Sequence, residues 1–157
     1  MNKKNKKKNK KTRVTTHQSK LYHFTSTAHL PLIFKSGYLK LTESNLTAPS
    51  NYFDSLPKPE HLLYKPVVWL TTSKDGNKLG IEGSVVDKKE VRITLNKKKH
   101  YISWKKWSKQ NKIKSSWANW LNRSGNSDEW YISEKIIEIN AENILRIENA
   151  YTGEIYL

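Results

Sequence analysis

Residues 21–37 decide how the fold begins, and they read Leu-Tyr-His-Phe-Thr-Ser-Thr-Ala-His-Leu-Pro-Leu-Ile-Phe-Lys-Ser-Gly. The first five residues are rich in aromatic side chains and predict a short strand. Ser26 or Thr27 can cap a following helix, Pro31 is tolerated only in its first turn, and Gly37 supplies a left-handed stop. This helix of about two turns should have an apolar face, built at spacings of three and four by Leu30, Ile33 and Phe34.

The rest of the chain adds mostly short strands to this opening. Val67–Thr72 is the clearest buried strand, and Glu90–Leu95 alternates like a half-buried one. Shorter extended pieces are predicted over residues 38–41, 129–132, 136–139, 144–148 and 154–157. One longer helix is predicted over Ser103–Trp120, and loops are predicted over residues 42–66, 74–83 and 121–128. This alternation of few helices with many short strands indicates an α+β fold.

Charge divides the chain into a tail and a domain. The formal net charge is +15 over 157 residues, and residues 1–20 hold nine lysines or arginines and no acid. Residues 1–19 are too poor in apolar side chains to offset their ordering entropy, so we expect a disordered basic tail followed by one domain over residues 20–157. A second acid-free stretch, Lys97–Lys114, holds eight lysines. Both stretches favour contact with polyanions through counterion release.

Several classes of protein are disfavoured by composition. The chain has no cysteine, which removes disulfides and thiolate chemistry. It has no apolar run of about 20 residues and no signal-like segment, so we expect a cytoplasmic protein without a membrane partner. We also expect a monomer. Its five histidines show no metal-ligand spacing, so no metal is expected. Neither a phosphate-binding Gly-Lys-Ser/Thr loop nor a Gly-x-Ser-x-Gly elbow is present.

Three ordered segments resemble motifs of the ADP-ribosyltransferase superfamily. Residues 21–26, Leu-Tyr-His-Phe-Thr-Ser, with the helix that follows, are similar to the opening strand and helix of its DarT-like branch. Residues 67–73, Val-Val-Trp-Leu-Thr-Thr-Ser, resemble the second motif strand. Residues 127–132, Ser-Asp-Glu-Trp-Tyr-Ile, resemble the closing motif, in which a catalytic glutamate opens a strand. The resemblance covers about residues 21–147 and implies a split sheet, with two small antiparallel sheets around an NAD cleft.

The resemblance also implies roles for individual residues, with NAD as the substrate that donates ADP-ribose. Glu129 would bind the 2′-hydroxyl of the nicotinamide ribose and stabilise the oxocarbenium-like sugar as the glycosidic bond breaks. His23 would bind the adenosine ribose with Thr25 beside it, and the backbone of Phe24 would hold the nicotinamide amide. The nicotinamide end would be lined by Thr71, Thr72 and Ser73. The aromatic residue that stacks on nicotinamide is left open between Tyr38 and Trp69.

Two features depart from the family pattern. Many members place a tyrosine about ten residues after the second strand, where this chain reads Lys78-Leu-Gly-Ile. DarT-like enzymes, which modify DNA, use an arginine near the donor, and no arginine lies between His23 and Trp69. The RNA 2′-phosphotransferase branch relies on paired arginines that are also missing. The acceptor class therefore stays open.

The sequence predicts an NAD-dependent mono-ADP-ribosyltransferase that modifies a macromolecular acceptor, either a nucleic acid or an associated protein. A toxin, a phage effector and a repair enzyme would share these motifs. The alternative is a noncatalytic nucleic-acid-binding module that uses a Lys/Trp surface. Within that surface, Trp104 and Trp107 could be core residues or could stack on bases, whereas Trp117 and Trp120 fit a core better.

Overall fold

The computed structural model describes residues 20–41, 66–76, 79, 86–113 and 115–157. The predicted tail 1–19 and nearly all of the predicted loop 42–66 lie outside these residues. The strands are β1 (Lys20–Thr25), β2 (Tyr38–Leu39), β3 (Val68–Thr71), β4 (Val91–Asn96), β5 (Ile102–Ser103), β6 (Trp130–Ser133), β7 (Ile137–Glu138) and β8 (Ile144–Asn149). The α-helices are α1 (Leu30–Ser36), α3 (Trp104–Gln110) and α4 (Ser115–Ser124).

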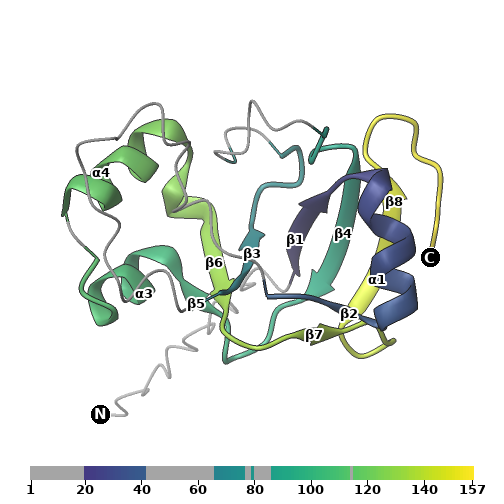
Figure 1. Cartoon of the computed structure of the whole chain (residues 1–157), viewed down its shortest axis with the longest axis horizontal. Helices are drawn as coiled ribbons and strands as arrows, with labels where there is room; N and C mark the ends of the chain where they lie inside the picture. The colour runs from purple at the N-terminus through teal and green to yellow at the C-terminus, as the bar shows by residue number, and fades with distance from the viewer. Residues whose placement is uncertain (1–19, 42–65, 77–78, 80–85, 114) are drawn as a thin grey trace, which may run out of the picture.

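The described strands form two antiparallel sheets, as Figure 1 shows. The larger sheet has the strand order β5-β6-β3-β1-β4-β8, and β2 pairs with β7 in the smaller one. Two antiparallel sheets with few helices confirm the α+β class. The chain order and the spatial order differ, because β1 lies between β3 and β4 and is paired with both.

The main core lies on one face of the β1–β4–β8 half of the large sheet. Leu21 faces Leu95, and Ile93 faces Ile147, in the registers of these three strands. Residues paired across antiparallel strands share a face, so these side chains form one apolar layer and are buried. Leu30 of α1, with Leu39 and Ile137 of the small sheet, completes the cluster.

The helix α1 begins and ends at the predicted signals. The Ser26 hydroxyl accepts a hydrogen bond from the backbone N–H of Ala28 and caps a 3₁₀ turn, Thr27–His29, that leads into α1. Pro31 lies in the first turn, and Gly37 ends the helix in the left-handed region with φ 77°. The predicted apolar face is only partly correct. Leu30 is buried and Ile33 packs against the core, but Phe34 is exposed.

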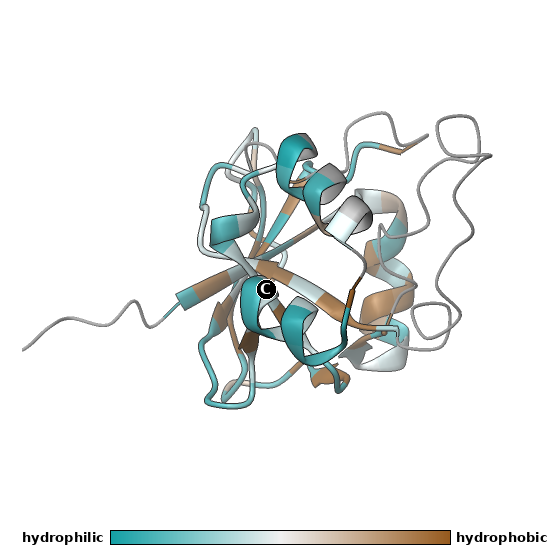
Figure 2. Cartoon of the chain, turned by 90° about the vertical axis from the view of Figure 1, so that its left-hand side faces the viewer, coloured by the Kyte–Doolittle hydropathy of each residue, from teal (hydrophilic) through white to brown (hydrophobic). Residues whose placement is uncertain are grey.

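A second core made of tryptophans lies on the opposite face, at the β3–β6–β5 end of the sheet. It contains Trp104 and Trp107 of α3, Trp130 and Ile132 of β6, and Val67, all buried. Figure 2 looks onto this end and shows hydrophilic residues along α3 and α4 in front of hydrophobic strands. The core interpretation therefore holds for Trp104 and Trp107, whose indole rings are not available to stack on a base.

The single predicted helix 103–120 is wrong, because the chain breaks it after Gln110. The N–H of Ile113 bonds the carbonyl of Ser108, and the N–H of Lys112 bonds that of Lys109, with Lys112 at φ 51°. These bonds form a Schellman motif with lysine in the left-handed position that glycine usually occupies. The predicted loop 121–128 is also wrong. The helix α4 continues to Ser124, and Ser127–Glu129 form a 3₁₀ turn.

Candidate active site

The large sheet brings the three predicted motif segments together as the neighbouring strands β1, β3 and β6. Tyr22 pairs with Thr71, and Thr71 pairs with Trp130, so one row crosses all three strands. Beside this row, the backbone N–H of Thr72 donates to the carbonyl oxygen of Glu129 at 2.9 Å. With one strand between β1 and β6, their backbones are about 10 Å apart. Segments that are distant in sequence thus converge on one region of the fold.

The sheet is almost divided between β1 and β3. β1 pairs with β4 at six positions, but β1 and β3 share the single register pair Tyr22–Thr71. Beyond that pair, the Nδ1 atom of His23 lies 2.8 Å from the carbonyl oxygen of Trp69. The imidazole therefore bonds a β3 carbonyl where no register pair joins the two strands. This is the only place where the described part of the large sheet is held by so few pairs.

The hydrogen bond to Trp69 fixes the tautomer of His23. A carbonyl oxygen only accepts, so Nδ1 must carry the proton, and a neutral ring then leaves Nε2 with a free lone pair. Burial lowers the pKa of His23 below 6.5, the bond to Trp69 opposes this shift, and His29 adds to it. At neutral pH, His23 is therefore uncharged and its Nε2 is an acceptor, suited to a hydroxyl donor.

Thr25 and His29 extend this polar group. Thr25 is buried, and its Oγ1 lies 3.1 Å from Nδ1 of the His29 ring. His29 was missed by sequence reasoning, which treated the turn before α1 only as a helix start. The spacing of four residues between Thr25 and His29 across that turn could have indicated the contact. The hydroxyl of Thr25 is therefore already engaged with a ring on the same segment.

Phe24 is held by the turn that follows β3. Its ring is buried, and a Cβ placed on Gly76 would lie 2.9 Å from its Cε1 atom. Gly76 has φ 65°, in the left-handed region that favours glycine. Within the same turn, the N–H of Ser73 donates to Oγ1 of Thr71 at 3.0 Å. Thr71 is buried and supports the turn, whereas Thr72 and Ser73 are half-buried.

Glu129 occupies the end of the 3₁₀ turn directly before β6. Its N–H bonds the carbonyl of Asn126, which fixes the backbone, and its side chain is half-buried. No hydrogen bond or ion pair joins its carboxylate to another described residue. Asp128, one residue earlier, is exposed and paired with Lys105. The two neighbouring acids are thus distinguished by their surroundings, because only Asp128 is neutralised by a cation of the described chain.

The structure does not bring the two candidate stacking residues to His23. The indole of Trp69 belongs to the tryptophan core, with ring centroids 5.4 Å from Trp104 and 5.7 Å from Trp130. Only its carbonyl reaches His23. Tyr38 is half-buried on the small sheet, opposite Glu138. No described contact joins the Tyr38 ring to β1 or β3.

Two further properties concern the described residues as a whole. No three of their histidine, aspartate and glutamate side chains gather in an arrangement that could hold a metal ion. None of their helices has the length and apolar character that crossing a bilayer requires. Comparison of the chain with protein-family models, with curated proteins and with solved structures finds no match.

Proposed function

We propose that the chain is an NAD-dependent mono-ADP-ribosyltransferase with a macromolecular acceptor. The bond between C1′ of the nicotinamide ribose and the nicotinamide nitrogen breaks, and its electron pair stays with the ring, which leaves as neutral nicotinamide. A nucleophilic oxygen or nitrogen of the acceptor bonds to C1′ and releases its proton to solvent. The carboxylate of Glu129 stabilises the positive charge that develops on the sugar.

The observation that carries this proposal is the convergence of three segments. The end of β3 holds Glu129 through the Thr72 backbone bond, and β3 also anchors His23 through the Trp69 carbonyl. The neutral imidazole, whose Nε2 makes no hydrogen bond with another described residue, supports a contact with a ribose hydroxyl. The near-division of the sheet between β1 and β3 supports a dinucleotide lying along that junction, because few backbone bonds close it.

The role of Glu129 is tested by nicotinamide release from NAD. Glu129→Gln keeps the size of the side chain and removes its charge. Loss of one preorganised electrostatic group should lower kcat by roughly 10²- to 10³-fold. The matched control is Asp128→Asn, which removes the neighbouring charge and should leave kcat within about twofold of wild type. Equal turnover by wild type and Glu129→Gln would remove Glu129 from the mechanism.

The role of His23 is tested separately by a substitution that keeps its structural bond. In His23→Asn, the amide nitrogen can replace Nδ1 as the donor to Trp69, but nothing replaces Nε2. Loss of one hydrogen bond should raise KM for NAD by up to about tenfold, with a smaller change in kcat. The thermal midpoint should stay close to wild type. An unchanged KM in a folded variant would place NAD elsewhere.

The alternative function is a noncatalytic nucleic-acid-binding module, and the net charge of +15 favours it. Nucleic-acid binding that persists in Glu129→Gln and His23→Asn, in a protein that releases no nicotinamide with any acceptor, would establish this alternative. With both tryptophans of α3 buried, such a module would need an aromatic surface other than Trp104 and Trp107.

A further inference from the structure

The outer face of the β1–β4–β8 half-sheet is hollowed, on the side opposite the main core. Tyr22 of β1, Thr94 of β4 and Arg146 of β8 form one cross-strand row. Their neighbours Leu21, Leu95 and Ile147 point into the core, so this row points away from it. The concave surface encloses about 350 Å³. It lies on the face of the sheet opposite that of His23, and this outer face also carries Thr71, which pairs with Tyr22.

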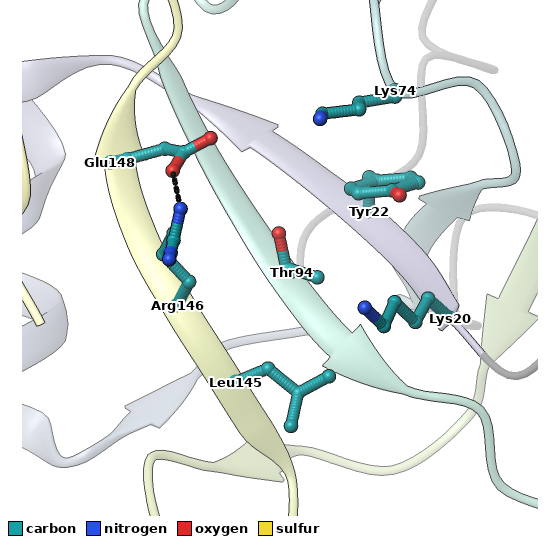
Figure 3. Close-up of a pocket in the computed structure, with 7 residues that line it drawn as sticks. All are labelled: Lys20, Tyr22, Lys74, Thr94, Leu145, Arg146 and Glu148. Atoms are coloured by element: carbon teal, nitrogen blue, oxygen red, sulfur yellow. Dashed lines mark hydrogen bonds and ion pairs between the residues drawn. The ribbon is translucent and has the colours of Figure 1, made fainter. Parts of the chain in front are cut away.

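A β-bulge shapes one wall of this surface. Thr94 pairs with Arg146 and Leu95 pairs with Ile144, so Leu145 is an extra residue in β8. A bulge redirects the side chain of the inserted residue. Figure 3 shows Leu145 below Arg146 at the edge of the pocket, with Tyr22 and Lys20 on the other side. The wall is thus apolar at one point and cationic around it.

Among the described residues that line this surface, the one acid is already neutralised, so this part of the surface is cationic. Lys20, Lys74 and Arg146 line the pocket together with Glu148. The carboxylate of Glu148 is paired with Arg92 and lies 3.3 Å from Arg146. Burial disfavours its charge, but these two arginines hold its pKa below the ordinary value. The amines of Lys20 and Lys74 have no ion pair with a described residue and remain available to an anion.

Tyr22 supplies an aromatic ring between these amines. Figure 3 shows the ring between Lys74 and Lys20, beside the Thr94 hydroxyl. The ring is half-buried on the sheet surface. An aromatic ring on an open sheet, flanked by cations at different points, suits a strand whose bases stack while its phosphates contact the amines. An acidic peptide would use the cations but not the ring.

We propose that this outer face binds a single-stranded polynucleotide, with a base stacked on Tyr22 and phosphates at Lys20, Lys74 and Arg146. Charge complementarity continues along the sequence, because residues 1–19, which directly precede Lys20, contain eight lysines or arginines and no acid. Binding at this face does not require NAD or Glu129. It would dock a strand on the face of the sheet opposite His23.

The test measures binding of a fluorescein-labelled single-stranded oligonucleotide to the full chain by anisotropy, over a range of salt concentrations and without NAD. Tyr22→Leu should weaken binding roughly 5- to 100-fold, whereas Tyr22→Phe, which keeps the ring, should bind like wild type. Equal affinities for wild type and a folded Tyr22→Leu would overturn the proposal.

The phosphate contacts are tested with two triple variants of equal charge. Changing Lys20, Lys74 and Arg146 to glutamine should make the negative slope of log K against log salt shallower by about 2, at roughly 0.7 per phosphate contact. The control changes three exposed lysines elsewhere, Lys35, Lys40 and Lys135, and should change the slope much less. Equal changes in slope for the two triple variants would overturn the proposed phosphate contacts, because only the overall charge of the chain would then matter. Displacement of the oligonucleotide by polyglutamate as effective as by unlabelled strand would assign the face to acidic peptides instead.

A measurement on the unaltered protein covers the case in which a variant fails to fold. Photocrosslinking with an oligonucleotide containing 4-thiothymidine, followed by peptide mass spectrometry, should place an adduct on Tyr22. Adducts confined to residues 1–19 or to Lys97–Lys114 would overturn the proposal. Because no step uses NAD, failure here leaves the transferase proposal standing, and failure of nicotinamide release leaves this one standing.

Discussion

The substitution Gly76→Ala should destabilise the protein through a specific contact with Phe24. A Cβ at this position would lie 2.9 Å from Cε1 and 3.0 Å from Cζ of the Phe24 ring. Real Cβ atoms do not approach other atoms that closely, so the ring or the turn must move. The ring is 9% exposed and packed into the fold, so it has little room to yield. The turn after β3, which carries Thr72 and Ser73, would be displaced instead.

The expected magnitude has two parts. Gly76 has φ 65°, and an L-residue in the left-handed region costs about 1–2 kcal/mol. Forcing a methyl group into a packed site costs about 1–3 kcal/mol more. Together they predict a loss of about 2–5 kcal/mol in the free energy of unfolding. Gly37→Ala isolates the first part, because Gly37 has φ 77° and a methyl group added there would meet nothing within 4 Å. It should cost about 1–2 kcal/mol.

Urea unfolding followed by tryptophan fluorescence measures both variants. The informative quantity is the difference between Gly76→Ala and Gly37→Ala, which is expected to be about 1–3 kcal/mol. A double variant that also carries Phe24→Leu should recover part of this difference, since the shorter side chain makes room for the new methyl group. Equal costs for the two alanine variants, or no recovery with Phe24→Leu, would refute the close packing of Phe24 against the turn.

Three other predictions concern single contacts. Burial lowers the pKa of His23 in the folded protein. The contribution of the neutral His23 side chain to the free energy of unfolding is therefore complete above about pH 6.5 and is lost as the pH falls through the lower native pKa. In His23→Asn, acid unfolding should lose this part of its pH dependence. Trp107 is buried and donates from Nε1 to Glu134 at 2.8 Å, so Trp107→Phe should cost about 1–3 kcal/mol in urea unfolding. Glu134→Gln, which still accepts this bond, should cost less than half as much. Arg92→Met should lower the free energy of unfolding by about 2 kcal/mol at pH 7, because Glu148 loses one of its two arginine partners. Since the pKa of Glu148 is lowered in the folded protein, this cost should shrink as the pH falls below 4.5. A constant cost from pH 7 to 4 would contradict the ion pair.

Signals that act within a few residues could be predicted from the sequence. Ser26, Pro31 and Gly37 set the limits of α1 through hydrogen-bond capping and backbone restriction, which depend on near neighbours. The alternation predicted over Glu90–Leu95 correctly identified the buried face of β4, Val91–Asn96, because side chains alternate along any strand. The end of α3 could not be predicted in this way, because its Schellman motif places Lys112, a residue that carries no local turn signal, in the left-handed position.

The motif residues of the candidate site were also available from the sequence, but their arrangement was not. Which strands are neighbours, and how many pairs join them, depends on the burial of apolar faces over the whole chain. The single Tyr22–Thr71 pair and the His23–Trp69 bond result from that packing. The same packing places the indole of Trp69 in the tryptophan core and leaves its backbone carbonyl oxygen to bond His23.

The chain's own sequence therefore determined the local elements, the excess of positive charge and the residue types that NAD chemistry would need. Tertiary structure alone decided which of those residues meet, and it placed Tyr22 and Arg146, 124 positions apart, on one hollowed face through the pairing of β1, β4 and β8. The physical reason is range. Capping and alternation are set by neighbouring residues, whereas strand register is set by the burial of side chains that are distant in the sequence.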